Sequence, residues 1–146
     1  MEDKIPVIKL RENAEIPKRA TRESAAVDLK ACIDEAVTIA PGASITVPTG
    51  IALAVPEGFG AFIFARSGLG IKHGIALSNG VGVIDADYRG EVCVGLHNHS
   101  GESYTVNPGD RIAQMAIMPV VMADFFEAET LSDTERGTGG FGSTGK

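Results

Sequence analysis

The sequence has no tryptophan, few aromatic residues of any kind, and no apolar run long enough to span a bilayer. Its most apolar window, residues 115–126, is interrupted by Pro119 and Asp124 and is too short to cross a membrane as a helix. The N-terminus has no apolar run behind a basic start, so we expect no secretory signal. These absences predict a cytoplasmic protein with no membrane partner.

Cysteine and histidine are also scarce, with two and three residues respectively. Cys32 and Cys93 each stand alone in a β-like segment, without the CxxC spacing of zinc and redox sites, and we expect both to be buried and reduced. His97 and His99 alternate as two metal ligands on one strand face would, yet no third ligand lies at metal spacing. We interpret them, and His73, as solvated histidines.

Positive charge is in short supply, because 13 Lys and Arg face 19 Asp and Glu and the formal net charge is −6. A protein that neutralises phosphates along a duplex needs a basic stripe, so the composition argues against a nucleic-acid partner. Any phosphate site must therefore be local.

Glycine and proline are abundant instead. The 18 Gly and 7 Pro disfavour long helices, and 146 residues with 44% hydrophobic content suffice for one domain with a real core. Short β-like segments separated by turn signals occur at 7–10, 25–31, 44–47, 51–55, 61–65, 91–96 and 111–117. This spacing predicts an all-β fold, a jelly-roll barrel or sandwich, over residues 1–135.

Two segments, 61–65 and 115–122, are apolar on both faces, whereas a lone sandwich should have one wet face. A closed cyclic homo-oligomer would bury the second face, and we expect one. Residues 136–146 differ in kind, since they contain five glycines and one aromatic residue, Phe141. We expect a flexible C-terminal tail that holds no fixed shape by itself.

Residues 79–91 are the stretch richest in chemical groups. Bulky β-formers lead to a corner that gathers Asp85, Asp87, Tyr88 and Arg89 before Gly90, and strand character resumes at 92–94. The pattern is typical of a β-hairpin with reactive groups at its tip. Taken alone, the segment is better explained as an ordinary hairpin with a polar turn, because Asp and Gly favour turns for conformational reasons alone.

Three weaker signals concern phosphate. Arg66 and Ser67 follow a buried strand at the start of a short predicted helix, where Ser67 is either an N-cap or part of an anion site. The second signal is residues 110–114, which an ordinary surface turn entering a strand also explains. In the tail, Gly137 and Gly142 have the spacing of the P-loop glycines, but Ser143 occupies the position of the P-loop lysine, which excludes a Walker NTPase loop. Two interpretations remain: a glycine-rich segment that binds phosphate through its backbone, or a flexible terminus.

Five segments in this order resemble the motifs of the trimeric deoxyuridine triphosphate nucleotidohydrolases (dUTPases), at 26–29, 66–70, 79–90, 109–114 and 136–144. The third and fifth are the most specific. The first departs from the family's A-G-Y-D-L pattern, because it keeps Asp28 and Leu29 but has Ala26 and Val27 in place of the glycine and tyrosine.

The resemblance implies a jelly-roll homotrimer whose three sites each draw on all three subunits and hydrolyse dUTP to dUMP and pyrophosphate. Such an enzyme keeps uracil out of DNA and supplies dUMP for thymidylate synthesis. Asp85 would be the general base that activates water for attack on the α-phosphate; Asp87 is the neighbour with which it can be confused. Tyr88 would lie under the deoxyribose and exclude a 2′-hydroxyl, while Asn79 and the backbone at Gly82 and Val83 would recognise uracil and exclude thymine.

The resemblance also assigns the phosphate and metal contacts. The phosphates would be held by Arg66, Ser67, Gly68 and Gln114, and closed over by Arg136, Gly140, Ser143 and Thr144, while Phe141 covers the base. Mg²⁺ would be held by the phosphates and waters, with Asp28 reaching it through water.

Two other functions remain open. A dCTP deaminase has the same fold and a catalytic glutamate after the third motif, which is roughly where Glu91 lies. A jelly-roll protein that senses dUTP without turnover is the second; an intact Asp85, Gln114 and tail argue against it.

Overall fold

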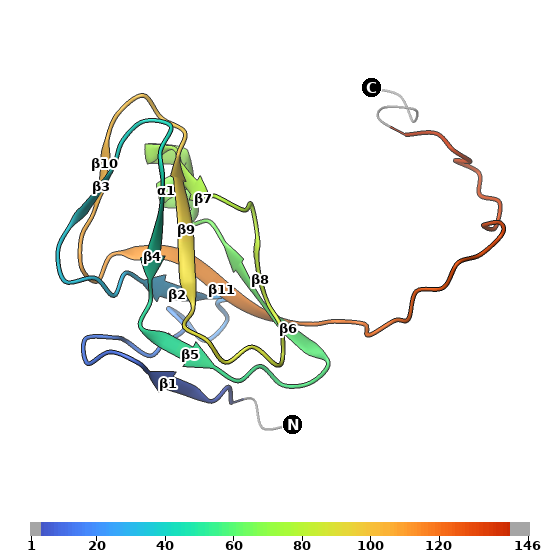
Figure 1. Ribbon diagram of the computed structural model, residues 1–146, viewed down its shortest axis with the longest axis horizontal. Coiled ribbons are helices and arrows are strands. Elements are labelled where there is room, and N and C mark those ends of the chain that lie inside the picture. Colours follow the sequence, from blue (N-terminus) through green and yellow to red (C-terminus); the bar gives the residue numbers. More distant parts are fainter. Residues whose placement is uncertain (1–3, 141–146) are drawn as a thin grey trace.

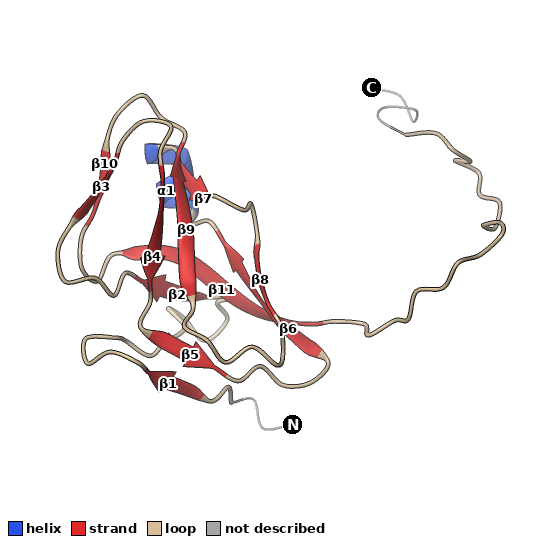
Figure 2. Cartoon of the chain, in the orientation of Figure 1, coloured by secondary structure: helices blue, strands red, loops and turns tan. Residues whose placement is uncertain are grey.

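The computed structural model describes residues 4–140, and their regular secondary structure is almost all β-strand, with one short helix (Figures 1 and 2). The elements are β1 (Val7–Lys9), β2 (Val27–Lys30), β3 (Val37–Ile39), β4 (Ser44–Pro48), β5 (Ile51–Leu53), β6 (Phe59–Phe64), α1 (Ser67–His73), β7 (Ile75–Leu77), β8 (Gly82–Ile84), β9 (Cys93–Asn98), β10 (Tyr104–Val106) and β11 (Arg111–Pro119). The all-β prediction is confirmed. No helix in residues 4–140 is long and apolar enough to cross a membrane.

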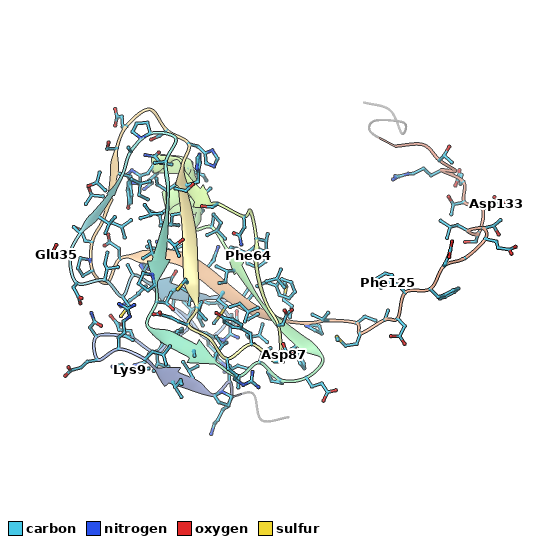
Figure 3. All side chains as sticks on the ribbon, in the orientation of Figure 1. Lys9, Glu35, Phe64, Asp87, Phe125 and Asp133 are labelled. Atoms are coloured by element: carbon cyan, nitrogen blue, oxygen red, sulfur yellow. The ribbon has the colours of Figure 1, made fainter. Side chains whose placement is uncertain are left out.

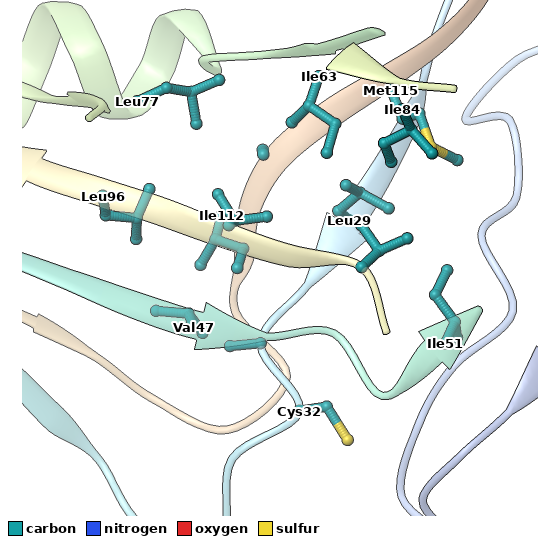
Figure 4. Close-up of a cluster of buried hydrophobic side chains, with 14 of the residues drawn as sticks. Leu29, Cys32, Val47, Ile51, Ile63, Leu77, Ile84, Leu96, Ile112 and Met115 are labelled. Carbon is teal, nitrogen blue, oxygen red and sulfur yellow. The ribbon is translucent and has the colours of Figure 1, made fainter. Parts of the chain in front are cut away.

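Two antiparallel sheets form the body. One has the order β2-β11-β6-β8 and the other β4-β9-β7, and the short pairs β1-β5 and β10-β3 complete it. Both sheets contribute to one buried cluster, with Leu29, Ile63 and Met115 from the first and Val47 and Leu96 from the second (Figure 4). At roughly 1.5–3 kcal/mol for each fully buried aliphatic side chain, this shared core holds the two sheets together.

The longest pairing, between β11 and β6, runs from Gln114↔Phe64 to Pro119↔Phe59. Ala61 and Ile63 point into the core, so Phe62 and Phe64 point to the other face, where they are only half-buried. Val83 stands opposite Phe62 on β8 and is 63% exposed. The second face of this sheet is therefore apolar around β6 and β8, as the sequence suggested, and the described part of the chain leaves it partly exposed.

After Pro119 the chain leaves the body as an extended arm, residues 120–140, which contains no strand (Figure 1). Its apolar side chains stand clear of the body (Figure 3); Phe125 is 99% exposed, and Val121, Met122, Phe126 and Leu131 are nearly as open. Residues 120–122, which are apolar in the sequence, are therefore exposed in the single chain, and their burial between subunits stays a prediction. The predicted tail contacts Phe141, Ser143 and Thr144 lie outside the described residues.

Cys93 is also exposed, not buried as predicted, whereas Cys32 is buried. Val92, Val94 and Leu96 occupy the inward face, so alternation turns Cys93 outward at the first position of β9. The prediction that Cys93 is buried was wrong because the buried residues on either side of it determine which face of the strand it occupies.

Candidate active site

The corner at Asp85 joins the two sheets. Strand β8 pairs with β6, whereas β9 pairs with β4 and β7, so the predicted hairpin between residues 79–84 and 92–94 is wrong. Ile84 ends β8 in one sheet, Val92 directly precedes β9 in the other, and both are buried in the common core. The sequence shows the same alternation of apolar residues whether these two segments pair with each other or belong to different sheets. The crossover begins with a turn in which the Tyr88 N–H donates to the Asp85 carbonyl at 3.2 Å.

A hollow of about 210 Å³ lies against this corner. Its wall combines the residues predicted for base, sugar and catalysis with apolar neighbours, namely Asn79, Gly82, Val83, Asp85 and Tyr88 with Ile63, Ile84, Val92 and Cys93. Asp87 is not among them. The volume is below the ~300–1,000 Å³ of pockets that take drug-sized ligands, so it suits one fragment of a nucleotide. We call it the corner hollow.

Tyr88 is held by its own turn. Its hydroxyl donates to the Glu91 carbonyl at 3.0 Å, and a Cβ atom added at Gly90 would lie 2.6 Å from Tyr88 Cζ. No residue with a side chain fits at position 90 unless the ring moves. Arg89 donates from Nη1 to the carbonyls of Ala86 and Tyr88, at 2.7 and 2.8 Å, so its guanidinium stabilises the turn.

The Glu91 side chain also stabilises the crossover. Its Oε1 accepts from the Gly50 backbone N–H at 2.9 Å and pairs with Arg11 Nε at 3.3 Å. These bonds tie the crossover to the end of β4 and to the N-terminal segment. The carboxylate is therefore already engaged, and it is not a lining residue of the corner hollow.

A second hollow, of about 330 Å³, collects the residues predicted for phosphate and metal. Asp28, Arg66, Ser67 and Gln114 line it, together with Ala20, Ser24, Ala25, Ala26 and Arg111. Gln114 lies opposite Asp28 in the β2–β11 register, and its Nε2 donates to the Ala65 carbonyl at 2.9 Å. We call it the phosphate hollow. It shares no lining residue with the corner hollow.

Asp28 sits between two guanidinium groups. Arg66 Nε donates to Asp28 Oδ1 at 2.8 Å, Arg111 Nη1 donates to Oδ2 at 3.3 Å, and Arg66 Nη1 donates to the Arg111 carbonyl at 3.2 Å. Arg111 was not among the predicted site residues. Strict alternation puts positions 111 and 114 on opposite faces, but the register shifts between Arg111 and Ala113, and this bulge brings Arg111 to the face of Asp28 and Gln114.

Helix α1 begins beside this cluster. Arg66, not Ser67, occupies the N-cap position, with extended backbone (φ −88°, ψ 132°) and no side-chain cap, so the predicted Ser67 N-cap is wrong. Ser67 starts the helix and faces the phosphate hollow, and a Cβ added at Gly68 would have nothing within 4 Å. The early N–H groups of a helix lack intrahelical partners and suit an anion.

The described residues contain no group of three or more His, Cys, Asp or Glu that could hold a metal ion. Mg²⁺ commonly keeps several waters and binds through one or two carboxylates plus substrate phosphates, so Asp28 beside the phosphate hollow fits this ion without a protein cage.

His97 Nδ1 lies 2.8 Å from Ser44 Oγ, and the centroid of the His97 ring lies 4.3 Å from that of His99.

The predicted residues thus fall into three places. The corner hollow is lined by the residues predicted for the base and the sugar, and the phosphate hollow by Arg66, Ser67, Gln114 and Asp28, with Gly68 next to Ser67 in the chain. Arg136 and Gly140 belong to the arm, which extends from the body (Figure 1), and neither of them lines either hollow. One chain does not bring the three together in the described structure.

Comparison with known proteins bears on the family and the fold. The dUTPase family model matches residues 12–145. The deoxyuridine 5′-triphosphate nucleotidohydrolase of Desulfitobacterium hafniense (strain Y51) is 50% identical over 143 residues, covering 97% of this chain and 95% of the relative. That of Salmonella typhimurium is 50% identical over 132 residues, covering 90% and 87%.

Solved structures give the same result. The Staphylococcus bacteriophage 80alpha dUTPase with dUPNHPP has a TM-score of 0.90 at 27% identity and covers 99% of each chain. A dUTPase of phage phi11 of S. aureus, described with a structural Mg(II) ion, has a TM-score of 0.79 at 25% identity and covers 88% of this chain and 98% of that one. With a family model that matches residues 12–145, half of its residues identical to those of curated relatives and its fold in common with solved dUTPases, the chain belongs to the dUTPase family.

Proposed function

We propose that the protein is a dUTP diphosphatase that hydrolyses dUTP to dUMP and pyrophosphate. The observation that carries the proposal is the corner hollow, where one short segment supplies a carboxylate, an amide and a fixed tyrosine to a space of about 210 Å³. Asp85 is the general base, which orients a water and takes its proton as the oxygen attacks the α-phosphate. Asp87, outside the hollow, has no part in this step.

Selectivity comes from shape in the same hollow. Tyr88 packs under the deoxyribose, and because Gly90 and the Glu91 carbonyl fix its ring, it cannot yield to a 2′-hydroxyl. Asn79 and the backbone at Gly82 and Val83 recognise the edge of uracil, and the narrow space excludes the methyl group of thymine.

The phosphate hollow receives the triphosphate chain. Arg66, Gln114, Ser67 and the N–H groups at Ser67 and Gly68 supply donors to phosphate oxygens. Bound Mg²⁺ neutralises phosphate charge and polarises the phosphoryl group, and Asp28 contacts it through water. A protein with a net negative charge thereby concentrates positively charged side chains and the bound Mg²⁺ at one point on its surface.

We further propose that the active unit is a homotrimer in the cytoplasm, with each site shared between subunits. Two features of the chain support sharing: the corner and phosphate hollows have no lining residue in common, and no residue of the described arm lines either of them. The half-exposed face of Phe62 and Phe64 and the apolar arm supply surface for assembly. The tail, residues 136–146, then closes a site through Arg136, Gly140, Ser143 and Thr144, with Phe141 over the base.

Pyrophosphate release measured with dUTP, dCTP, dTTP and UTP tests the proposal, with the Asp85→Asn variant as the control for contaminating phosphatases. We expect release from dUTP alone, and equal release from UTP or none from dUTP would refute it. Ammonia release from dCTP tests the deaminase, which the engagement of Glu91 by Gly50 and Arg11 disfavours. Tight dUTP binding without turnover would establish the sensor.

A further inference from the structure

We propose that a third hollow, next to the phosphate hollow, is a second anion site that takes inorganic pyrophosphate after its release from dUTP. The inference rests on the proposed function and adds to it a place for the leaving group. This hollow has a volume of about 540 Å³, and residues from 9–20, β2 and the start of β11 line it. We call it the basic hollow. It shares Ala20, Asp28 and Arg111 with the phosphate hollow, so the two adjoin.

The first step concerns charge. Six ionisable side chains line the basic hollow, four of them cationic and two anionic, namely Lys9, Lys18, Lys30, Arg111, Glu15 and Asp28. The hollow is therefore net positive, on a protein whose formal net charge is −6. Apolar side chains of Ile16 and Pro17 lie between these charges in the lining. Because low-dielectric walls focus the field of the charges around a cleft, this hollow concentrates anions from solution.

The second step concerns which of the cations lack an acidic partner. Lys30 and Arg111 are each paired with a carboxylate of the same hollow, at 2.6 and 3.3 Å. Among the described residues, no carboxylate oxygen lies within 4.0 Å of the ammonium nitrogen of Lys9 or Lys18. Lys9 Nζ donates only to the neutral carbonyl of Glu12, at 2.7 Å. Two ammonium groups are thus available to neutralise a bound anion.

The third step concerns the wall between these two lysines, which the body holds in place. The Leu10 N–H donates to the Gly50 carbonyl at 2.7 Å. Cys32 Sγ donates to Asn13 Oδ1 at 3.0 Å, and Ala14 is buried in the core cluster. The wall is therefore formed before any anion arrives, and a preformed site loses less conformational freedom when it binds.

The fourth step concerns the ligand. Attack of water on the α-phosphate frees pyrophosphate at the phosphate hollow, which has two cationic side chains and one carboxylate in its lining. The adjoining basic hollow is larger and has an excess of two cations. Its free cations are lysines, whose ammonium groups act as point charges on flexible stems and accept a phosphate in many orientations, whereas arginine favours one planar arrangement. Such a lining suits a product in transit better than a substrate that must be oriented.

The test is a calorimetric titration of inorganic pyrophosphate into protein saturated with a non-hydrolysable α,β-imido analogue of dUTP, which occupies the corner and phosphate hollows. We expect one pyrophosphate to bind per chain. Lys18→Gln should weaken this binding about two- to fivefold, the scale of one partly exposed charge pair, and adding Lys9→Gln should weaken it further. Glu15→Gln should strengthen it by a similar factor, because it removes a carboxylate that competes for Lys30.

Lys72→Gln is the matched control. Lys72 is exposed and lines a different hollow, which has no lining residue in common with the corner, phosphate or basic hollow, so this variant should bind pyrophosphate like the wild type. The three substituted lysines and Glu15 are exposed, so the variants should keep the wild-type melting temperature.

Three results would overturn the inference: no pyrophosphate bound to the saturated protein, an equal loss of affinity in Lys72→Gln, or weaker binding in Glu15→Gln. Equal affinity for sulfate and pyrophosphate would overturn the assignment of the ligand. A wild-type protein that fails to bind the analogue would instead refute the proposed function. Pyrophosphate is then titrated into the unliganded protein, where loss of affinity in Lys18→Gln but not in Lys72→Gln supports the anion site, and equal affinities refute it.

Discussion

Replacing Gly90 with alanine should damage sugar discrimination without altering any residue expected to touch the substrate. The new Cβ would lie 2.6 Å from Tyr88 Cζ, whereas carbon atoms in contact are about 3.5–4.0 Å apart, so the ring must move by about 1 Å. That movement strains or breaks the hydroxyl's bond to the Glu91 carbonyl, worth about 0.5–1.5 kcal/mol. Overpacking adds about 1–3 kcal/mol to the loss of stability.

The functional effect of this change is larger than its effect on stability. A displacement of ~1 Å in a group that positions substrate can cost about 100-fold in rate, so kcat/KM for dUTP should fall by about 10- to 100-fold. UTP hydrolysis should fall much less, because the displaced ring no longer blocks the 2′-hydroxyl. The ratio of the two kcat/KM values, measured by pyrophosphate release, reports the discrimination directly.

Gly101→Ala is the matched control, since a Cβ there meets nothing within 4 Å and the backbone is not in the left-handed region. It should leave activity, selectivity and melting temperature unchanged. If Gly90→Ala kept the wild-type ratio of dUTP to UTP, the ring of Tyr88 would not be the group that senses the sugar, and the reasoning from the corner hollow would fail.

Further experiments address the base, the subunits and the thiol. Asp85→Asn should bind the imido analogue almost normally but turn over at least about 100-fold more slowly, whereas Asp87→Asn stays near wild type; the reverse order would exchange their roles. In a second experiment, the Asp85→Asn chain is refolded with an equal amount of a chain that ends after Glu135. About three quarters of the trimers should be mixed and each should have one intact site of three, so about a quarter of all sites should regain activity. No rescue in demonstrably mixed trimers would mean that the base and the tail of a site come from the same chain. The Cys93 residue is exposed overall, but partial desolvation, reinforced by Glu91, raises the pKa of its thiol, so the thiol stays protonated and reacts slowly with alkylating agents at pH 7. Its alkylation rate should rise with pH and should fall when the analogue fills the corner hollow, and a rate independent of pH would contradict this.

Much of the site could be predicted because it is local in sequence. Asn79, Asp85 and Tyr88 lie within one turn-rich segment, and any fold that closes this segment into a tight corner brings them near one another. The all-β class could be predicted for a similar reason, since glycine, proline and alternating apolar residues act over a few positions.

Long-range pairing could not be predicted in the same way. The apolar residues on both sides of the Asp85 corner satisfy a hairpin and a crossover equally well, and only the arrangement of both sheets decides between them. Arg111 is 83 residues from Asp28, and a single bulge in β11 brings the two together. Residues 121–126 have the composition of a core strand, but composition does not reveal whether the partner surface belongs to the same chain.

The arm after Pro119 bears on what happens to a chain that has folded but not yet assembled. All the strands of the body precede the arm, so the body can be complete while Val121, Phe125 and Phe126 are still open to solvent. A stable fold and an aggregation-prone surface then exist in the same molecule. Loss of unassembled chains to aggregates should therefore follow protein concentration and the rate at which chains meet their partners, and making the core more stable would not prevent it.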